Sequence, residues 1–361
     1  MSHPRRRDAL RSRLRAAELD ALLVTDPHNV RYLTGFTGSN AALLVDAEGD
    51  EQTLFCTDRR YETQSARQVP DLRRLVERAC DRRLATEATG RGVARLGFES
   101  HVVTVDAHDA LADIAGAERL HRAPRHVEEL RLVKDDAEVE ALRAACATAD
   151  SALVGLLADG GIRPGRTELA VARDLEQRMV EAGATGPSFE TIVAAGVHSA
   201  VPHHRPTATE LRRGDLVKMD FGALVDGYHS DMTRTVVLGE PTDWQRELYD
   251  LVAAAQAAGR AALHPGADVR EVDAAARSVI VAAGRGEQFL HGLGHGVGLQ
   301  IHEAPALSPL GVGRLAAGMA VTVEPGVYLV DRGGVRIEDT LVVRDGGPEL
   351  LTLTTKDLLH V

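Results

Sequence analysis

Two hydrophobic patterns follow one another along the chain. In the first third, short apolar runs alternate with polar turns that contain glycine, a pattern typical of strands in a small α/β unit. The expected strands are Ala21–Val24, Ala41–Val45 and Thr53–Cys56. Pro124 then marks a boundary, because proline interrupts helices and strands alike. We therefore expect an N-terminal domain over residues 1–125.

Long helices dominate the pattern after this boundary. Asp135 followed by Glu138, and Thr242 followed by Gln245, are capping boxes that open helices. Further helix starts are expected at Thr167 and Asp268. Strand-like segments lie between and after the helices: Thr191–Ala195, Leu216–Asp220, Ser230–Leu238, Met319–Glu324 and Val335–Val343. The predicted fold class is α+β, with a second domain over residues 126–361.

Composition and charge narrow the class of protein. The 361 residues are 44% hydrophobic and 26% charged, as in soluble globular proteins, while only 3% are aromatic, which predicts a core of Ala, Val and Leu. The net charge of −11 argues against a nucleic-acid partner. The basic segment Arg5–Arg15 runs against this balance. Its apolar residues recur at helical spacing, so we expect it to be the solvated face of a first helix.

Neither a membrane segment nor a disulfide framework is expected. No stretch approaches the ~18 uninterrupted apolar residues of a membrane helix, and the N-terminus lacks a hydrophobic signal segment. Cys56, Cys80 and Cys146 are widely spaced and include no Cys-x-x-Cys pair, which indicates three reduced thiols. These features predict a cytoplasmic protein with no membrane partner.

Two aspartates interrupt strand-like segments of the second domain. Asp220 and Asp231 each lie beside an apolar run, and Asp226-Gly227 between them is a turn signal. With a four-residue loop that begins at Leu224, the aspartates would face each other in an antiparallel pair, with Cβ atoms about 4.5–5.5 Å apart. Carboxylates at that distance repel unless cations lie between them, and metal pairs in hydrolases are about 3.5–4 Å apart.

A second hairpin carries two glutamates. Glu324 ends an apolar run before Pro325, which cannot continue a strand ladder. The chain then returns into Val335-Arg-Ile-Glu338, so both glutamates could face one cleft. Either glutamate alone would be explained as an exposed strand end. Because the pair is matched by two aspartates, we interpret all four carboxylates as metal ligands.

His295 completes the predicted ligand set. It lies in Gly294-His295-Gly-Val-Gly298, where glycines allow close approach of the backbone. The segment lacks the spacing of a phosphate-binding loop, and His302-Glu303 is no zinc-protease motif, because an alanine occupies the place of the second histidine. One imidazole and four carboxylates form an oxygen-rich set that suits two divalent metal ions, Mn²⁺ first, with Co²⁺ or Zn²⁺ as alternatives.

Six segments of the second domain resemble, in order, the motifs of the pita-bread metallopeptidases. They are Met219-Asp-Phe-Gly, Ser230-Asp-Met-Thr-Arg, Gly294-His-Gly-Val-Gly, His302-Glu-Ala-Pro, Thr322-Val-Glu-Pro-Gly and Val335-Arg-Ile-Glu-Asp. This family includes Xaa-Pro aminopeptidase, Xaa-Pro dipeptidase (prolidase), methionine aminopeptidase and the metal-free creatinase. The segment Asn29–Asn40 resembles the proline-specific branch. The resemblance covers nearly the full chain and implies a creatinase/prolidase-like N-terminal domain followed by a pita-bread catalytic domain.

The resemblance also implies roles for the ligands. Asp220 would bind one metal ion, His295 and Glu324 would bind the other, and Asp231 and Glu338 would bridge both. A hydroxide shared by the ions would attack the scissile carbonyl, with Glu324 as general base and then general acid. The implied reaction is removal of an N-terminal residue that precedes proline, from short proline-containing peptides, by a homodimer.

Three histidines are predicted to act beside the metal ions. His203 matches the family position near the leaving group, although the adjacent His204 competes for this role. His302 matches a residue that stabilises the tetrahedral intermediate. His291 is a candidate for the proline pocket, with a purely structural role as the alternative.

Arg336 and Tyr228 complete the predicted substrate contacts. Arg336 lies two residues before Glu338, so the two would share one side of a strand. Arg336 could bind a carboxylate or the substrate's C-terminus, or it could form a structural salt bridge. The choice between aminopeptidase and dipeptidase stays open. Two alternatives also stay open, because fold and metal site do not fix the substrate. The protein could bind peptides or a partner without catalysis, or it could hydrolyse a non-peptide amide.

Overall fold

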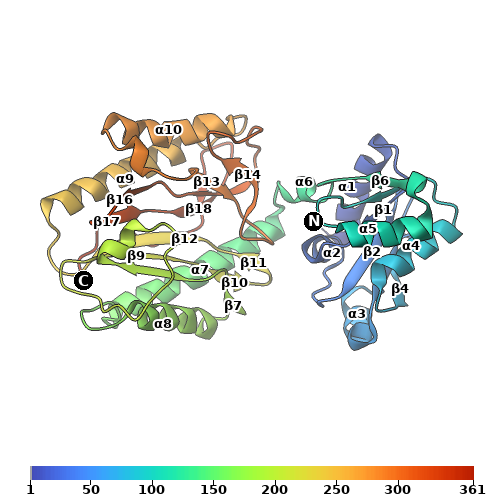
Figure 1. The fold of residues 1–361 in the computed structure, drawn as a ribbon, viewed down its shortest axis with the longest axis horizontal. Helices are drawn as coiled ribbons and strands as arrows, with labels where there is room; N and C mark the ends of the chain where they lie inside the picture. Colours follow the sequence, from blue (N-terminus) through green and yellow to red (C-terminus); the bar gives the residue numbers. More distant parts are fainter. Residues whose placement is uncertain (1) are drawn as a thin grey trace. The chain divides into compact units, whose positions relative to one another are not determined.

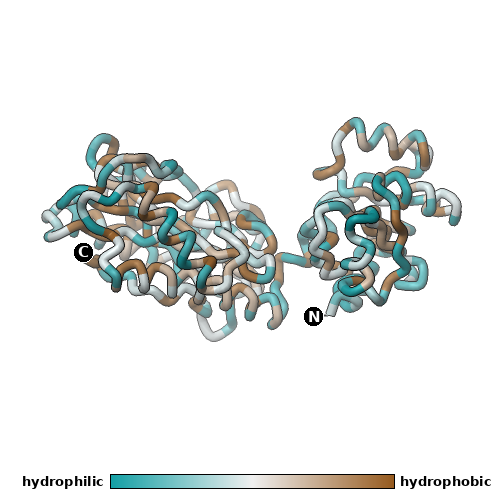
Figure 2. The backbone as a smooth tube through the Cα atoms, turned by 90° about the horizontal axis from the view of Figure 1, so that it is seen from below, coloured by the Kyte–Doolittle hydropathy of each residue, from teal (hydrophilic) through white to brown (hydrophobic). Residues whose placement is uncertain are grey.

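The computed structural model describes residues 2–361, which form two compact units, one that ends at Arg131 and one over Leu132–Val361 (Figure 1). The boundary expected after residue 125 lies just before the short helix Glu128–Arg131 (α6), the last element of the first unit. Figure 2 shows that hydrophilic and hydrophobic stretches alternate along the backbone of both units. This alternation is expected of elements that bury one face.

The first unit is a mixed sheet with the strand order β4-β3-β2-β1-β5-β6. Its strands are Ala21–Val24 (β1), Ala41–Asp46 (β2), Leu54–Thr57 (β3), Arg73–Val76 (β4), Leu96–Phe98 (β5) and Leu120–Arg122 (β6). Its helices, besides α6, are His3–Ala16 (α1), Pro27–Thr34 (α2), Glu62–Gln68 (α3), Cys80–Gly90 (α4) and Val105–Ala115 (α5). The three strands expected from the sequence are β1, β2 and β3, with ends shifted by no more than one residue.

The basic segment of α1 is not the solvated face that the sequence suggested. Arg6, Arg7 and Arg11 are buried, and Arg7 is fully covered. The Arg7 guanidinium donates two hydrogen bonds of 2.8 Å to the carboxylate of Asp50 and one of 2.6 Å to Asp71. A buried cation needs such partners, because removal of a charge from water costs several kcal/mol. Helical spacing alone does not reveal carboxylates that come from distant loops.

The second unit begins with helix Asp136–Ala158 (α7), as the capping box predicted. Asp135 accepts hydrogen bonds from two backbone N–H groups of the first turn, and Glu138 reciprocates. By length and composition alone, α7 is long and apolar enough to cross a membrane. It packs against the next helix and a strand of its own unit, and side chains such as Leu142 and Leu153 are buried there. This packing is that of a core helix.

The remaining helices of the second unit follow the predicted starts. They are Glu168–Glu181 (α8), Asp243–Ala261 (α9) and Val269–Ala282 (α10). The strands are Gly186–Pro187 (β7), Ile192–Ala195 (β8), Leu216–Phe221 (β9), Ala223–Val225 (β10), Tyr228–His229 (β11), Met232–Val237 (β12), Gly294–Gly296 (β13), Glu303–Leu307 (β14), Ala320–Val323 (β15), Gly326–Leu329 (β16), Gly333–Arg336 (β17), Asp339–Val342 (β18) and Glu349–Leu350 (β19).

The strands of this unit form a layer between two pairs of helices (Figure 1). Helices α7 and α8 pack on the sheets β12-β9-β8 and β11-β10-β7. Helices α9 and α10 pack on the sheet β14-β13-β15-β18-β19 and on the ribbon β16-β17. Each side has its own buried cluster, built mainly from Ala, Val and Leu, as the low aromatic content predicted.

The aspartate hairpin has a different register from the one predicted. Asp220 faces Thr233 across β9 and β12, and the loop contains only Asp226 and Gly227. These two residues have φ angles of 49° and 75°. Asp-Gly is favoured in such a two-residue turn, since its twist matches that of the strands. The pairing therefore shifts by two residues, and Asp231 becomes a diagonal neighbour of Asp220 on the same face.

The glutamate hairpin is interrupted where the glutamates lie. Strand β15 pairs with β18, and β16 pairs with β17, in one common register that places Glu324 across from Glu338 in the gap between the two ladders. The single strand predicted over Val335–Val343 is therefore wrong, because it is split into β17 and β18. The backbone N–H of Glu338 donates instead to the carbonyl of Thr233 in β12, at 3.1 Å. This hydrogen bond joins the two sheets that carry the predicted ligands.

Candidate metal centre and active site

A cavity of about 570 Å³ in the second unit is lined by residues from both hairpins. The predicted residues on its wall are Asp220, Asp231, His295, Glu324, Glu338, His203, His302, His291 and Arg336. Tyr228 is not among them, because it is buried elsewhere and its hydroxyl donates to Glu138 of α7 at 3.0 Å. The structure thus brings together every predicted site residue except Tyr228.

The two aspartates have different partners. Asp220 Oδ2 accepts a hydrogen bond from the Arg336 guanidinium, which is itself buried. Asp231 Oδ2 lies 3.5 Å from His295 Nε2. Burial and the nearby charge of Asp220 raise the pKa of Asp231 to about 6, although His295 opposes the shift. A raised pKa means that the charged carboxylate lacks full compensation within the protein.

The two glutamates are fixed by threonine hydroxyls. Thr322 Oγ1 donates to Glu324 Oε1 at 3.2 Å, and Thr233 Oγ1 donates to Glu338 Oε2 at 2.7 Å. Burial raises the pKa of Glu324 to about 7. Burial also raises the pKa of Glu338 well above its ordinary value, and the neighbouring carboxylates of Asp231 and Glu324 add to this shift.

His295 is aimed at the carboxylates by its own backbone. A Cβ atom on Gly294 would lie 2.1 Å from the carbonyl oxygen of Thr322, so only glycine allows this packing. His295 Nδ1 donates to the Gly296 carbonyl at 3.0 Å, which leaves Nε2 facing Glu324 Oε1 at 3.4 Å. Burial alone would lower the pKa of His295, but the hydrogen bond to Asp231 and the charge of Glu324 raise it to about 9.

The donor set fits two divalent cations. Asp220 Oδ1 and Glu338 Oε1 are buried on this cavity and have no hydrogen-bond partner among residues 2–361. A buried oxygen without a partner costs about 1–3 kcal/mol, and more when it is charged. Four carboxylates face a single arginine here, so two divalent cations would both neutralise them and satisfy the two oxygens.

Two of the histidines on the wall are held by specific contacts. The His302 ring lies edge-on to His295, with centroids 4.5 Å apart, and burial lowers its pKa. His291 Nε2 lies 2.8 Å from the hydroxyl of Tyr328, and its Nδ1 donates to the Gly292 carbonyl at 2.8 Å. Burial and the charge of Arg336 lower the pKa of His291 to about 4, which keeps its ring neutral.

The contacts of His204 separate it from His203. His204 Nε2 lies 2.9 Å from Glu168 Oε2, and its ring stacks on His198 with centroids 4.3 Å apart. These contacts tie His204 to α8. His203 is solvent-exposed at the cavity, and this favours it over His204 as the side chain that meets a substrate.

Lys218 supports the wall of the cavity, and it was not singled out from the sequence. It is fully buried in β9, and its Nζ donates to the carbonyls of Val201 and Pro202 at 2.6 and 3.3 Å. Arg336 Nη1 also donates to the Pro202 carbonyl, at 3.2 Å. Both side chains therefore hold the segment that leads into His203. The sequence did contain a signal for Lys218. It lies two residues before Asp220 in an apolar strand, so the two side chains share one face of that strand.

Comparison with known proteins agrees with this geometry. Residues 140–345 match the metallopeptidase family M24, and residues 6–133 match the creatinase/prolidase N-terminal domain. The chain belongs to metallopeptidase family M24. The prediction of a creatinase/prolidase-like domain followed by a pita-bread metallopeptidase domain is thereby confirmed.

Relatives and solved structures resemble the chain over nearly its whole length. It is 35% identical over 341 residues to an Xaa-Pro dipeptidase of Pyrococcus furiosus, which covers 94% of this chain and 95% of the relative. An Xaa-Pro dipeptidase structure from Bacillus anthracis has a TM-score of 0.95 at 38% identity and 100% coverage of both chains. An X-Pro aminopeptidase structure from Thermotoga maritima MSB8 has a TM-score of 0.90 at 31% identity, covering 98% of this chain and 99% of the other.

Proposed function

We propose that this metallopeptidase is a dinuclear exopeptidase that hydrolyses the bond between an N-terminal residue and a following proline in short peptides. The observation that carries the proposal is the convergence of four carboxylates and one imidazole on a single cavity, where Asp220 and Glu338 each present an unpartnered oxygen. Specificity for proline is supported by relatives that are named for Xaa-Pro cleavage.

The proposed ligands come from the two hairpins and from β13, which carries His295. Asp220 would hold one cation, His295 and Glu324 would hold the other, and Asp231 and Glu338 would contribute to both. The oxygen-rich set favours Mn²⁺. Bound there, two cations would activate a water by lowering its pKa to about 7, and would polarise the scissile carbonyl.

The chain's own residues would supply the proton transfers. Glu324, oriented by Thr322, lies on the cavity wall where it can accept a proton from water and return it. A prolyl bond is a tertiary amide, so its departing nitrogen must gain a proton to leave as a secondary amine. His203 and His302 both lie on the cavity wall. In this proposal His203 would assist at the departing nitrogen, and His302 would donate to the developing oxyanion.

Arg336 acts in this proposal through a ligand rather than through the substrate. Its guanidinium is already engaged by Asp220, Thr233, Tyr328 and the Pro202 carbonyl. It therefore orients Asp220 and has little capacity left for a substrate carboxylate. Tyr228 is not proposed as a substrate contact, because its hydroxyl serves Glu138.

We further propose that the protein is a cytoplasmic homodimer. Three buried free thiols, Cys56, Cys80 and Cys146, suit a reducing compartment. The homodimer follows from the family resemblance alone. Light scattering of the purified chain at several concentrations tests it, with a mass of twice 38.7 kDa as the expected result and a monomer mass as the contrary one.

Peptide hydrolysis tests the proposed reaction. Metal-stripped and Mn²⁺-reconstituted protein should be assayed with an Xaa-Pro dipeptide, an Xaa-Pro-Yaa tripeptide and alanine controls, with Asp231→Ala as the inactive reference. We expect Mn²⁺-dependent cleavage of the prolyl peptides only, and the ratio of dipeptide to tripeptide rates distinguishes dipeptidase from aminopeptidase. No cleavage of any peptide by protein with two bound metals would contradict the proposal, in favour of another amide or of binding alone.

A further inference from the structure

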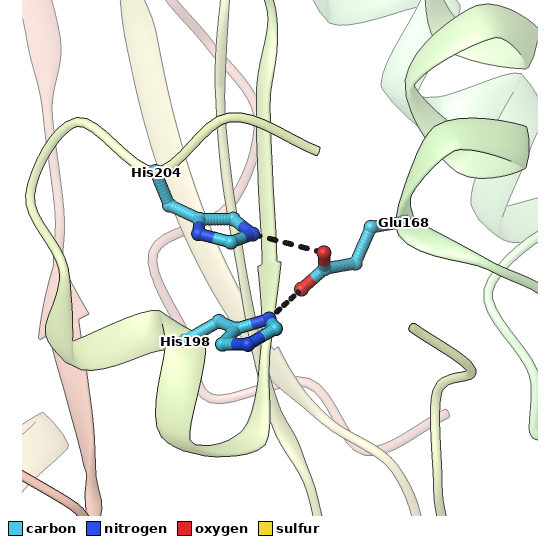
Figure 3. A group of neighbouring side chains, drawn as sticks. All are labelled: Glu168, His198 and His204. Atoms are coloured by element: carbon cyan, nitrogen blue, oxygen red, sulfur yellow. Dashed lines mark hydrogen bonds and ion pairs between the residues drawn. The ribbon is translucent and has the colours of Figure 1, made fainter. Parts of the chain in front are cut away.

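A second group of side chains that could hold a metal ion lies in the second unit, outside the ligand set described above (Figure 3). Glu168 is the first residue of α8, His198 lies in the short 3₁₀ helix Gly196–Ala200, and His204 follows in the loop before β9. His198 Nδ1 lies 2.9 Å from Glu168 Oε1, and His204 Nε2 lies 2.9 Å from Glu168 Oε2. The three ligand atoms lie within 4.8 Å of one another.

The carboxylate of this group is held in place independently of the two histidines. Glu168 is fully buried, and its Oε1 accepts a hydrogen bond from the Ala195 N–H at 2.9 Å. Its Oε2 accepts hydrogen bonds from the backbone N–H and the hydroxyl of Thr207, at 2.9 and 2.7 Å. Metal-binding carboxylates are oriented by hydrogen bonds of this kind. Glu168 is therefore already fixed when a cation arrives.

The two imidazoles are arranged to share one ligand. Their rings stack at 28° with centroids 4.3 Å apart, and both turn a nitrogen toward the same carboxylate (Figure 3). A neutral imidazole carries its proton on either nitrogen, so His198 Nδ1 and His204 Nε2 can each present a lone pair instead of an N–H. The same three side chains can thus hydrogen-bond to one another without a cation and would each bind a cation placed between them.

The distances need only a small adjustment. Zn²⁺ binds nitrogen and carboxylate oxygen at about 2.0–2.2 Å, so neighbouring ligand atoms in a tetrahedral site are about 3.3–3.5 Å apart. The spacing of 2.9 Å in this group must therefore open by about half an ångström. The His198 side chain is 31% exposed, so it has room to move and water can reach the group.

We propose that Glu168, His198 and His204 form a separate binding site for one divalent cation of the Zn²⁺ class. Two imidazoles and one carboxylate favour Zn²⁺, whereas the oxygen-rich set around Asp231 favours Mn²⁺, so the two sites differ in metal preference. His204 adjoins His203 on the cavity wall, so an occupied site fixes the segment that presents His203. The proposal does not depend on prolyl cleavage.

Zinc stoichiometry in the full-length protein tests the site. Metal-stripped wild type, His198→Ala and a matched control, His264→Ala, are dialysed against the same Zn²⁺ buffer and the bound zinc per chain is measured. His264 is solvent-exposed and outside the group, so its variant should bind as much zinc as wild type. His198→Ala should bind one zinc fewer. The comparison holds whatever number of ions the other centre takes.

Two further variants separate a ligand from a merely structural residue. His204→Ala should lose the same single zinc, and it serves if His198→Ala is unstable. His198→Cys replaces the imidazole by a thiolate, a good zinc ligand, and should recover the lost ion. Equal zinc content in wild type, His198→Ala and His204→Ala would overturn the proposal, as would an equal loss in His264→Ala, which would mark adventitious surface binding.

Discussion

Asp220 Oδ1 and Glu338 Oε1 define the candidate site at the scale of single residues. Each belongs to a carboxylate whose other oxygen is satisfied, by Arg336 and by Thr233. The protein thus fixes both carboxylates by one oxygen and leaves the other for a ligand. This arrangement is expected of metal-binding carboxylates, which need orientation as well as charge.

Lys218 is predicted to act on catalysis through His203. Lys218→Met removes the amino group that donates to the Val201 and Pro202 carbonyls, so the loop that presents His203 should loosen. A misplacement of about 1 Å can cost as much as 100-fold, and we expect kcat/KM for prolyl peptides to fall between about 10- and 100-fold. Bound Mn²⁺, measured on the same samples, should stay at the wild-type level. Unchanged kcat/KM, or a loss that follows lost metal, would contradict this role.

Asp50 is predicted to stabilise the first unit in a pH-dependent way. Burial would raise its pKa, but hydrogen bonds from Arg7 and Arg11 lower it below the ordinary value of 3.8. A depressed pKa gives stability that is complete above the unfolded value and is lost as pH falls through the folded one. At pH 7, Asp50→Asn should destabilise the unit by about 1–3 kcal/mol.

Hydrogen exchange of β2 amides in the full chain measures this stability. The difference between wild type and Asp50→Asn should stay constant above about pH 5 and shrink below about pH 4. A difference that grows on acidification would contradict the assigned partners.

At the scale of elements, short sequence motifs determine where the helices of the second unit begin. The capping boxes at Asp135 and Thr242 depend on residues three positions apart, so the starts of α7 and α9 were predictable from the sequence. The register of the aspartate hairpin was not, because one turn signal is compatible with loops of two or four residues. The break between β17 and β18 at Glu338 was also not predictable, because the backbone partner of Glu338, Thr233, lies in another hairpin.

The ligands of the candidate site were predictable from the sequence, but the residues that support them were not. The five predicted ligands stand out in the sequence because carboxylates in apolar strands demand compensation, and all five lie on the wall of the cavity. The supporting residues Lys218, Tyr328 and Thr233 look like ordinary strand residues in the sequence. Their roles come from contacts across elements that only the fold brings together.

The two-residue turn between β10 and β11 is predicted to be sensitive to substitution. Gly227 has a φ of 75°, a left-handed conformation that costs a residue with a Cβ atom about 1–2 kcal/mol. Gly227→Ala should therefore lower the free energy of unfolding by about 1 kcal/mol. Gly346→Ala is the matched control, because Gly346 has ordinary dihedrals and open space around its Cα.

Urea unfolding followed by the fluorescence of Trp244 measures this change, since Trp244 is the single tryptophan and lies in α9 of the same unit. Equal midpoints for Gly227→Ala and the wild type would show that the loop is not the two-residue turn described above.

At the scale of the whole molecule, the two halves of the second unit meet at the candidate metal centre. Asp220 and Asp231 come from the sheet covered by α7 and α8, whereas His295 and the two glutamates come from the hairpins covered by α9 and α10. Contacts such as Arg336–Asp220 and Thr233–Glu338 join the two halves, while the neighbouring carboxylates repel one another. Bound cations would relieve this repulsion as well as serve the proposed reaction.

Metal removal is predicted to destabilise this unit selectively. A ligand at 100 times its Kd stabilises the folded state by about 2.7 kcal/mol, so Mn²⁺ should raise the unfolding midpoint reported by Trp244. The amides of β2, in the first unit, should exchange at the same rate with and without Mn²⁺. Equal Trp244 midpoints with and without metal would contradict a cation-bound centre in the second unit.

The most direct test is an anomalous difference map from crystals of Mn²⁺-reconstituted protein. We expect two manganese peaks about 3.5–4 Å apart, one beside Asp220 and one beside His295 and Glu324, with Asp231 and Glu338 between them. A single peak at the cavity, or none while the protein still cleaves prolyl peptides, would contradict the dinuclear centre.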